Sequence, residues 1–525
     1  MVGWALAAAV PAGAAVNAEL TRYPYLTDSV QRSITVNWAS TRAQSTGSVQ
    51  FGPEGDCQAS SKTASKTQIT VNGVPEYQWR ASIPVVPDTR YCYRVRLGAA
   101  DLLGSDPAPV FTSQVASGST TPFSFAVFGD WGQAYATAPG QPNANPDQAN
   151  VLSQIAQSGA RFAVMTGDTA YPNGSQTNYG DLQQTGADVS AVFGPAFWSI
   201  PGRSIPVFNV TGNHGLFAGA TQMTNWPEGN AARTSAGRYR TDNYPSVAGA
   251  TGGRYPSFWY AFDAGPARFY VLTAAWADGN GGTNGVYAAD AAAHWAPGKA
   301  EYDWLAHDLQ THPGGLKFAF WHYPLYADTT GARSDTSLQG GPGTLQGLLD
   351  ANHVNIAFNG HAHGYQRNRP DPAGLVSYVF GNGGADLGPI SSCSVFDLYA
   401  IGKHGTHCGL APPNLTDDHV FGFAKVTVDG QHVTVTPTDE LGRTYDPQTY
   451  TFTTSTDDVA PGVPQHVAAT APTSTQVQLS WDASSDNVGV TGYRIYRDDQ
   501  FLSTMSGTGT SYVDGTVAPG TSYEY

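Results

Sequence analysis

One local pattern occurs five times in this sequence: a short apolar run that ends directly in a turn rich in glycine, carboxylate, amide or imidazole groups. Each run reads as a short buried strand. The runs are residues 125–128, 162–165, 207–210, 317–320 and 354–358. In α/β proteins ligands gather at the carboxyl ends of strands, and a glycine there lets the backbone turn sharply toward a bound ion. The repeated pattern therefore predicts an α/β fold with one site assembled from five strand ends.

The turns after these runs carry seven side chains that can bind metal. Each turn alone has an ordinary explanation, because Gly-Asp and Gly-Asn are common turn dipeptides and a histidine after a strand is often polar lining. Together they form a mixed oxygen and nitrogen set that is too large for one zinc ion and large enough for two ions that share a carboxylate. The set consists of Asp130, Asp168, Tyr171, Asn213, His322, His361 and His363. Two cations about 3.5–4 Å apart can hold a hydroxide and neutralise phosphoryl oxygens, which predicts hydrolysis of phosphate esters.

The order of these motifs, GD, GDxxY, GNH, a histidine after a strand and GHxH, resembles the purple acid phosphatases within the calcineurin-like metallophosphoesterases. The resemblance covers the central part of the chain and implies an α/β (α+β) metallophosphoesterase sandwich of mixed sheets flanked by helices. It also implies a binuclear centre of Fe(III) and a divalent ion, which would be Zn, Mn or Fe. Fe(III) would be held by Asp130, Asp168, Tyr171 and His363, and the divalent ion by Asp168, Asn213, His322 and His361, with Asp168 as the bridge. A phenolate such as that of Tyr171 is a hard anionic donor that suits a trivalent ion.

His214 follows Asn213 directly, and the resemblance does not assign it to a metal. It is the candidate to bind the phosphate or to protonate the leaving alkoxide, a role that suits an imidazole, and the alternative is a hydrogen bond to a ligand. The family's acidic residue after GNH is Gly215 here, so another group must orient His214. The paired histidines that plant members carry beyond the fourth motif are absent, and Arg333, His404 and His407 are the candidates to contact substrate instead.

Both ends of the chain read as all-β modules. Residues 33–38 alternate and include Trp38, and residues 477–481 likewise end in a tryptophan. The pattern P-x-T-x-Y-x-Y occurs at residues 87–93 and again at 519–525. Both modules resemble fibronectin type III domains, in which the tryptophan packs in the core and Tyr91 or Tyr523 would form a tyrosine corner. The second copy has less sequence after its tyrosine than the first, so we expect it to be cut short.

The predicted domain organisation has five parts. Residues 1–18 read as an incomplete or unusually short export signal, since no lysine or arginine precedes the apolar run, with a disordered tail as the alternative. Residues 19–118 form the N-terminal fibronectin III-like sandwich, 119–455 the catalytic domain, 456–464 an acidic, proline-rich linker and 465–525 a partial fibronectin type III domain. Within the catalytic domain we expect helices over 147–158, 299–309 and 344–352, and a hairpin whose strands cover 258–263 and 268–273. Residues 173–186 and 278–285 are expected to be surface loops.

The four cysteines favour two disulfides. Cys57 and Cys92 lie in one region and Cys393 and Cys408 in another, which indicates an oxidising compartment. The alternative, four thiolate metal ligands, lacks any CxxC spacing. The protein is therefore expected to be secreted.

The net charge of −15 argues against a nucleic-acid-binding surface, and we expect no transmembrane segment. The predicted function is a secreted acid phosphatase that hydrolyses phosphate monoesters. A phosphodiesterase or nucleotidase with the same centre is the alternative, and a non-catalytic adhesion protein is the second alternative. The C-terminal module is the candidate for contact with an extracellular polymer or surface.

Overall fold

The structure is a computed structural model of the 525-residue chain. It describes residues 16–30, 32–42, 46–133, 145–172, 174–184, 192–194, 201–210, 212–215, 247–248, 254–255, 259–272, 297–298, 300–330, 338–409, 420–452, 461–484, 490, 492–498, 500–506 and 509–525. The apolar run of the expected export signal and the expected loop at 278–285 lie outside these residues. The chain divides into two units, Met1–Ala306 with Leu316–Phe452, and His307–Gly315 with Thr453–Tyr525.

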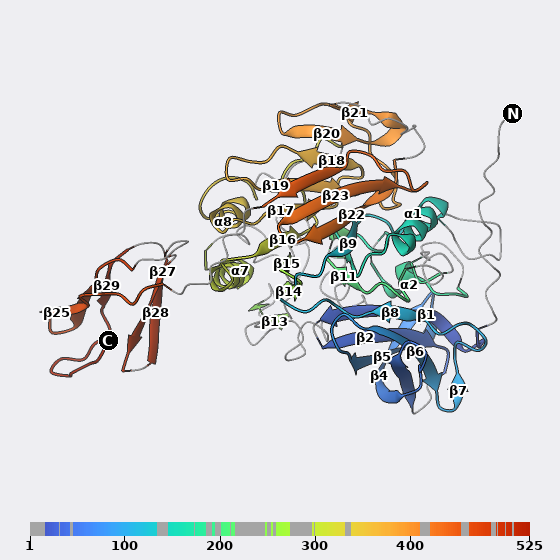
Figure 1. Ribbon diagram of the computed structural model, residues 1–525, viewed down its shortest axis with the longest axis horizontal. Coiled ribbons are helices and arrows are strands. Elements are labelled where there is room, and N and C mark those ends of the chain that lie inside the picture. The colour runs from blue at the N-terminus through green and yellow to red at the C-terminus, as the bar shows by residue number, and fades with distance from the viewer. Residues whose placement is uncertain are drawn as a thin grey trace. The chain divides into compact units, whose positions relative to one another are not determined.

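Two mixed β-sheets form the centre of the first unit (Figure 1). One contains β24 (Gln448–Thr451), β23 (His432–Asp439), β22 (Gly422–Asp429), β9 (Phe123–Phe128), β10 (Ala163–Met165) and β11 (Val207–Asn209), in that order. The other runs β14 (Tyr260–Ala264), β15 (Ala267–Val271), β16 (Leu316–Phe320), β17 (Ile356–Asn359), β19 (Val376–Phe380), β18 (Tyr365–Asn368), β20 (Asp397–Ile401) and β21 (His407–Cys408). Strands β9, β10 and β11 are parallel to one another, as are β15, β16, β17 and β19. The five predicted strands are therefore all present, and they supply parallel strand ends on both sheets.

Aromatic side chains fill the space between these sheets. Phe125 on β9 makes edge contacts with Phe269, Phe318 and Phe358 of the opposite sheet, at ring-centroid distances of 5.1, 5.4 and 6.5 Å. All four side chains are fully buried. Such pairs contribute about 0.5–1.5 kcal/mol each beyond the area that they bury, so this layer fixes the spacing of the two sheets.

The helices lie where the sequence predicts them. Helix α1 (Pro146–Gln157) is capped by Asn145, whose side chain accepts from the Gln148 amide, and proline occupies its first turn. Its apolar face packs on the side of the first sheet that faces away from the second, in a cluster with Ala126, Met165 and Val207. Helices α7 (Ala300–Thr311) and α8 (Leu345–Ala351) match the other two expected helices. None of the helices in the described part of the chain is long and apolar enough to cross a bilayer.

The N-terminal sandwich and the central part of the chain share a sheet. The sandwich contains β1 (Leu20–Val30), β2 (Ser33–Ser40), β3 (Gly47–Pro53), β4 (Ser60–Val71), β5 (Val74–Pro84), β6 (Arg90–Leu97), β7 (Ala100–Asp101) and β8 (Val110–Thr112). Strand β1 pairs with β2 on one side and, in parallel, with β11 on the other, where Thr27 lies opposite Val207. The sheet of the central part of the chain therefore continues into the sandwich, and the combined sheet has 14 described strands. The periodicity of the sequence did not predict this joint, because pairing partners are not encoded in the alternation of a single strand.

The aromatic residues predicted to support the two sandwich modules occupy the expected places. Trp38 is fully buried and stacks on Trp79 with ring centroids 6.2 Å apart. The Tyr91 hydroxyl accepts a hydrogen bond from the Val86 amide at 3.0 Å, and the Tyr523 hydroxyl accepts one from the Ala518 amide at 3.0 Å. A tyrosine bonded to the backbone five residues upstream is a tyrosine corner, and both modules contain one.

In the described residues of the second unit, five short strands form two sheets. Strands β25 (Ala468–Thr473), β26 (Gln476–Ser480) and β29 (Ser511–Asp514) form one sheet, and β27 (Gly492–Arg497) and β28 (Gln500–Ser506) form the other. Trp481 lies in its small core against Tyr493. Residues 519–525 form no strand, whereas the matching segment of the N-terminal sandwich is part of β6.

The first part of the predicted surface loop at 173–186 is not exposed. It contains helix α2 (Gln176–Tyr179), and Asn178, Tyr179 and Asp181 are buried against the N-terminal sandwich. Arg22 on β1, with no exposed surface, donates to the Gly180 carbonyl at 3.0 Å and to the carbonyl and side-chain oxygens of Gln176. The prediction failed here because small polar residues favour loops locally, while a buried guanidinium from a distant strand supplies the partners that the loop backbone needs.

Glu76 on β5 makes this junction sensitive to pH. Its carboxylate accepts from the Thr21 hydroxyl at 2.7 Å. Burial, together with the neighbouring carboxylate of Asp181, raises the pKa of Glu76 from 4.5 to about 8, against the opposing effect of Arg22. A carboxyl group whose pKa rises on folding stabilises the fold below its unfolded pKa, and that contribution is lost as the pH increases through the folded value.

We expect Glu76→Gln to remove this pH dependence, because glutamine resembles the protonated carboxyl group. Between pH 5 and pH 8 the free energy of unfolding of the wild-type protein should fall by on the order of 2 kcal/mol relative to that of the variant. Urea unfolding of both proteins at the two pH values measures this difference. Parallel pH dependence of the two proteins would contradict the assignment.

Candidate metal centre

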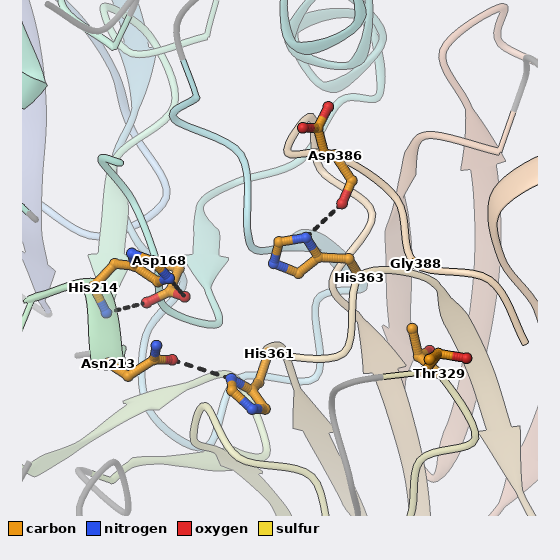
Figure 2. A pocket seen from close by; sticks show the side chains of 9 residues that line it. Asp168, Asn213, His214, Thr329, His361, His363, Asp386 and Gly388 are labelled. Atoms are coloured by element: carbon orange, nitrogen blue, oxygen red, sulfur yellow. Dashed lines mark hydrogen bonds and ion pairs between the residues drawn. The ribbon is translucent and has the colours of Figure 1, made fainter. Parts of the chain in front are cut away.

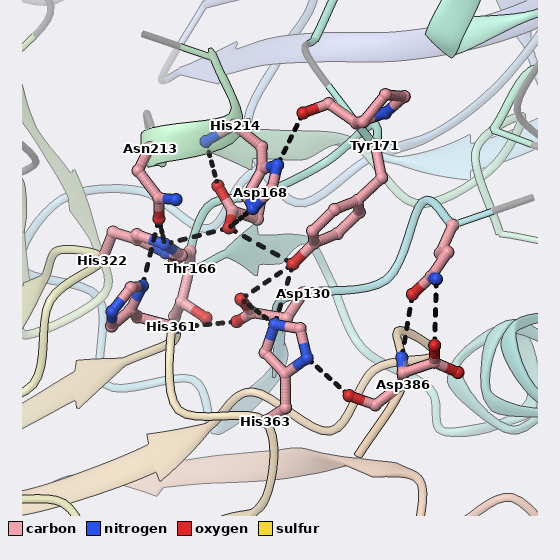
Figure 3. A network of polar contacts seen from close by, with 12 residues as sticks. Asp130, Thr166, Asp168, Tyr171, Asn213, His214, His322, His361, His363 and Asp386 are labelled. Carbon is pink, nitrogen blue, oxygen red and sulfur yellow. Dashed lines mark hydrogen bonds and ion pairs between the residues drawn. The ribbon is translucent and has the colours of Figure 1, made fainter. Parts of the chain in front are cut away.

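The ends of five strands bring the seven predicted ligands together (Figure 3). The first sheet contributes Asp130 after β9, Asp168 and Tyr171 after β10, and Asn213 after β11. The second sheet contributes His322 after β16 and both His361 and His363 after β17. All these strands point their carboxyl ends the same way within their sheets, so residues more than two hundred positions apart meet at one edge.

The backbone at this edge is held in unusual conformations. Asp130, Asp168 and His361 have φ values of 53°, 46° and 65°, in the left-handed region that costs a residue with a side chain about 1–3 kcal/mol. A side chain at Gly212 would overlap the Asp168 carboxylate, so the glycine of GNH is needed for the close approach of two turns. Strain of this kind persists where the surroundings fix it, which is common at ligand sites.

One group of donors surrounds the Tyr171 hydroxyl. Its oxygen lies 3.2 Å from Asp130 Oδ1, 3.2 Å from Asp168 Oδ2 and 3.0 Å from His363 Nε2. His363 Nε2 is in turn 3.4 Å from Asp130 Oδ1. These are the four residues that the resemblance assigns to a trivalent ion.

A second group surrounds Asn213 Oδ1. This amide oxygen lies 2.8 Å from His322 Nε2 and 3.0 Å from His361 Nδ1. His322 Nε2 is 3.2 Å from Asp168 Oδ2, the same oxygen that approaches Tyr171. Donor atoms of Asp168, His322 and His361 all lie within 4.8 Å of one another. The Asp168 carboxylate therefore belongs to both groups.

The spacing of these atoms fits two ions. Two donors that each lie about 2.1 Å from an ion at a right angle are about 3.0 Å apart, and the donor atoms within each group are separated by 2.8 to 3.4 Å. The histidine tautomers also fit. His322 Nδ1 donates to the Thr166 carbonyl at 2.9 Å and His363 Nδ1 to the Asp386 carbonyl at 2.6 Å. Each ring therefore directs Nε2 into the cluster, and Nδ1 keeps the proton that a metal-binding histidine retains.

The electrostatics of the cluster favour cations. Burial raises the pKa of Tyr171 well above its usual value, and the Asp168 and Asp130 carboxylates raise it further. Burial lowers the pKa of His322, but the same two carboxylates outweigh that effect and raise it to about 9. The protein alone therefore keeps both groups protonated, and a nearby cation is what would release them as ligands. Burial and His322 lower the pKa of His361 to about 3, so this imidazole is neutral and available.

His214 stands beside the cluster rather than in it. Its backbone amide donates to Asp168 Oδ1 at 2.9 Å, and its ring Nδ1 donates to the Pro172 carbonyl at 2.6 Å. Ring Nε2 lies 3.9 Å from Asp168 Oδ2. The Pro172 carbonyl thus orients the ring. This is the role that the family's acidic residue would have, at the position that Gly215 occupies here.

An open pocket of about 290 Å³ adjoins the cluster (Figure 2). Five of its lining residues are Asp168, Asn213, His214, His361 and His363. The others form a wall made of Thr329, Thr330, Asp386 and Gly388. Of the candidate substrate contacts, Arg333 lies outside the described residues, while His404 and His407 are described and do not line the pocket.

The sequence motifs did not predict this wall, although a signal for part of it is present in the sequence. Residues 376–380 are a sixth apolar run, and they lead into Gly381-Asn382-Gly383-Gly384 and then Asp386. This run is β19, which lies next to β17 in parallel, so its carboxyl end reaches the same edge. Thr329 and Thr330 follow no such run, and nothing in the local sequence indicates their position.

Residues 123–365 match the family model described as calcineurin-like phosphoesterase. The matched segment begins at β9 and extends past the turn with His361 and His363, so it contains every candidate ligand. These residues form a calcineurin-like metallophosphoesterase domain.

The chain is 24% identical to Purple acid phosphatase 15 of Arabidopsis thaliana over 294 residues, which is 52% of this chain and 47% of that protein. It is 45% identical to Chitinase A1 of Niallia circulans over 69 residues, 13% of this chain and 10% of that protein. The chain thus spans less than half the length of these relatives. Among solved structures, purple acid phosphatase PPD1 from yellow lupin seeds is similar with a TM-score of 0.57 and 19% identity, over 83% of this chain and 75% of that one. The fold is that of a metallophosphoesterase, and the similarities support a hydrolase that acts on phosphoric esters.

Proposed function

We propose that this chain, whose central residues form a calcineurin-like metallophosphoesterase domain, is a phosphomonoesterase of the purple acid phosphatase type with a binuclear metal centre. The observation that carries the proposal is the position of Asp168 Oδ2, which is 3.2 Å from both the Tyr171 hydroxyl and His322 Nε2. A carboxylate shared by two donor groups supports two ions held side by side rather than one.

In this proposal, Asp130, Asp168, Tyr171 and His363 hold Fe(III), and Asp168, Asn213, His322 and His361 hold a divalent ion. The two ions would supply Lewis-acid stabilisation of phosphoryl oxygens and a nucleophile at neutral or acidic pH. The phenolic donor and both carboxylates favour a trivalent ion in the first group, because hard anionic oxygens suit hard cations. The second group, with two imidazoles and an amide oxygen, suits a divalent ion.

The protein's own contribution to the reaction is orientation and proton transfer. The Thr166 and Asp386 carbonyls fix the rings of His322 and His363. His214, held by the Pro172 carbonyl through Nδ1, keeps Nε2 toward the pocket. We assign to His214 Nε2 the proton that the leaving alkoxide of the ester takes up as its bond to phosphorus breaks.

The two disulfides support an extracellular protein. Disulfides join Cys57 to Cys92 and Cys393 to Cys408, with sequence separations of 35 and 15. Such bonds persist in oxidising compartments, and we propose that the protein is secreted. We also propose that residues 465–525 are a fibronectin type III-like module that contacts an extracellular polymer. The tyrosine corner at Tyr523 supports the fold assigned to this module.

The proposed function is tested on the purified protein with p-nitrophenyl phosphate and bis(p-nitrophenyl) phosphate, together with metal analysis and the visible spectrum. We expect two metal ions per chain, a tyrosinate-to-iron charge-transfer band, and a kcat/KM at least about tenfold higher for the monoester. Tyr171→Phe should abolish the band, because the phenol oxygen is the only atom removed. A strong preference for the diester would defeat the monoesterase assignment, and a colourless protein with two bound ions would defeat the ferric one.

A further inference from the structure

The wall of the pocket beside the metal cluster includes one carboxylate, that of Asp386. Of the nine described lining residues, four are candidate metal ligands and one is His214. The other four, Thr329, Thr330, Asp386 and Gly388, form the wall. This described lining contains no lysine or arginine. A phosphate group bound at the cluster would therefore direct the rest of its ester toward hydroxyl groups and a carboxylate.

The wall is fixed by backbone hydrogen bonds. The Gly388 amide donates to the His363 carbonyl at 2.8 Å, and the Thr330 amide donates to the Pro389 carbonyl at 2.8 Å. The Lys403 amide donates to the Gly388 carbonyl at 2.8 Å, so this lysine reaches the wall through its backbone and does not line the pocket. These three hydrogen bonds fix the backbone of the wall at Thr330 and Gly388.

Hydrogen bonds hold both the backbone and the carboxylate of Asp386. Its backbone amide donates to Gln133 Oε1 at 2.9 Å, and its carboxylate accepts from Gln133 Nε2 at 3.2 Å. Its carbonyl accepts from His363 Nδ1 in the metal cluster at 2.6 Å. Figure 2 shows Asp386 adjacent to His363, at the rim of the pocket. The side chain is exposed, and Figure 2 shows its carboxylate pointing away from His363, so the charge acts on a substrate across solvent and not by direct contact at the cluster.

We propose that Asp386 is a specificity-determining residue that selects phosphate monoesters with a neutral or cationic leaving group, such as a polyol or an amino alcohol, against esters with a second anionic group. The inference rests on the proposed function and deepens it. Like charges a few ångströms apart repel, and the repulsion acts on substrate entry and binding within a Debye length of about 8–10 Å. The pocket volume of about 290 Å³ also suits a small leaving group, since it lies at the low end for ligand pockets.

Asp386→Asn tests the inference with three two-carbon esters that differ in charge: phosphoethanolamine, 2-hydroxyethyl phosphate and phosphoglycolate. The substitution removes the charge but leaves the Asp386 backbone groups that bond to Gln133 and His363. We expect the ratio of kcat/KM for phosphoglycolate to that for phosphoethanolamine to rise about tenfold in the variant. The change in kcat/KM for 2-hydroxyethyl phosphate should lie between the changes for the other two substrates. Comparison of each substrate with itself in the two proteins cancels intrinsic differences in leaving-group reactivity.

The matched control is Asp429→Asn, which removes the same charge from an exposed residue of β22 outside the pocket lining. Its substrate ratio should equal that of the wild type. Salt at about 0.5 M should reduce the difference between wild type and Asp386→Asn, because the interaction is screened. An unchanged ratio in Asp386→Asn, or an equal change in the control, would overturn the role of Asp386. Turnover of p-nitrophenyl phosphate would still support the proposed function in that case. Absence of hydrolysis of all these esters would overturn both.

Discussion

Asp168→Asn should release both metal ions and lower kcat/KM for p-nitrophenyl phosphate by roughly 10⁴-fold or more. The reason is that one oxygen, Asp168 Oδ2, lies 3.2 Å from a donor in each group, Tyr171 on one side and His322 on the other. Asparagine keeps the shape of the side chain but supplies a neutral oxygen and an amide nitrogen that cannot bridge two cations. Metal content by elemental analysis and turnover on the same samples measure the effect.

The matched comparison is Asn213→Ala. Asn213 Oδ1 lies 2.8 Å from His322 Nε2 and 3.0 Å from His361 Nδ1, both in the proposed divalent site. Its loss should therefore weaken that site and leave the band of the ferric site in place. Far-UV circular dichroism of both variants separates loss of metal from loss of fold. Retention of both ions by Asp168→Asn, with activity near that of the wild type, would show that Asp168 is not the bridge.

The second large effect is expected for His214→Ala, which should keep both ions yet slow kcat by roughly 10²–10⁴-fold. Ring Nε2 of His214 lies 3.9 Å from Asp168 Oδ2, farther than the 2.8 to 3.4 Å between the donor atoms within each group, and Nδ1 donates to the Pro172 carbonyl. If His214 gives its proton to the leaving alkoxide, the loss should be larger for an alkyl phosphate, whose leaving group is strongly basic, than for p-nitrophenyl phosphate.

The comparison of these two substrates decides between the roles of His214. Equal slowing of both would indicate that the imidazole binds the phosphate and does not act as an acid. Loss of metal from the variant would instead indicate a structural role for His214. Its backbone amide donates to Asp168 Oδ1 at 2.9 Å, which is the reason for this alternative.

Much of the fold was predictable because strand ends are encoded locally. An apolar run followed by glycine and a polar side chain marks where a strand stops and which side chain the turn presents. This was sufficient to identify Asp130, Asp168, Asn213 and the histidines as neighbours, since parallel strands in one sheet align their carboxyl ends. Tyr171, three residues beyond Asp168, was found from its place in the GDxxY motif and not from periodicity.

The remainder depended on contacts that sequence does not encode locally. The Pro172 carbonyl that holds His214 and the Thr166 carbonyl that holds His322 are backbone atoms, which any residue type could supply. Thr329 lies in the pocket only because its segment pairs with Ile390, far along the chain. Asp386 was within reach of the same pattern that found the ligands, since β19 ends in a glycine-rich turn.

The parallel pairing of β1 with β11 has a consequence for how this enzyme can have arisen and can be dissected. The strand that precedes the Asn213 turn has its outer edge covered by residues from the first thirty positions of the chain. A shortened protein that starts at the phosphoesterase motifs would bare that edge, a known route to aggregation, and would strip the guanidinium of Arg22 from the segment that follows Tyr171. The leading sandwich is therefore a structural extension of the central sheet and not an accessory that could be exchanged or discarded.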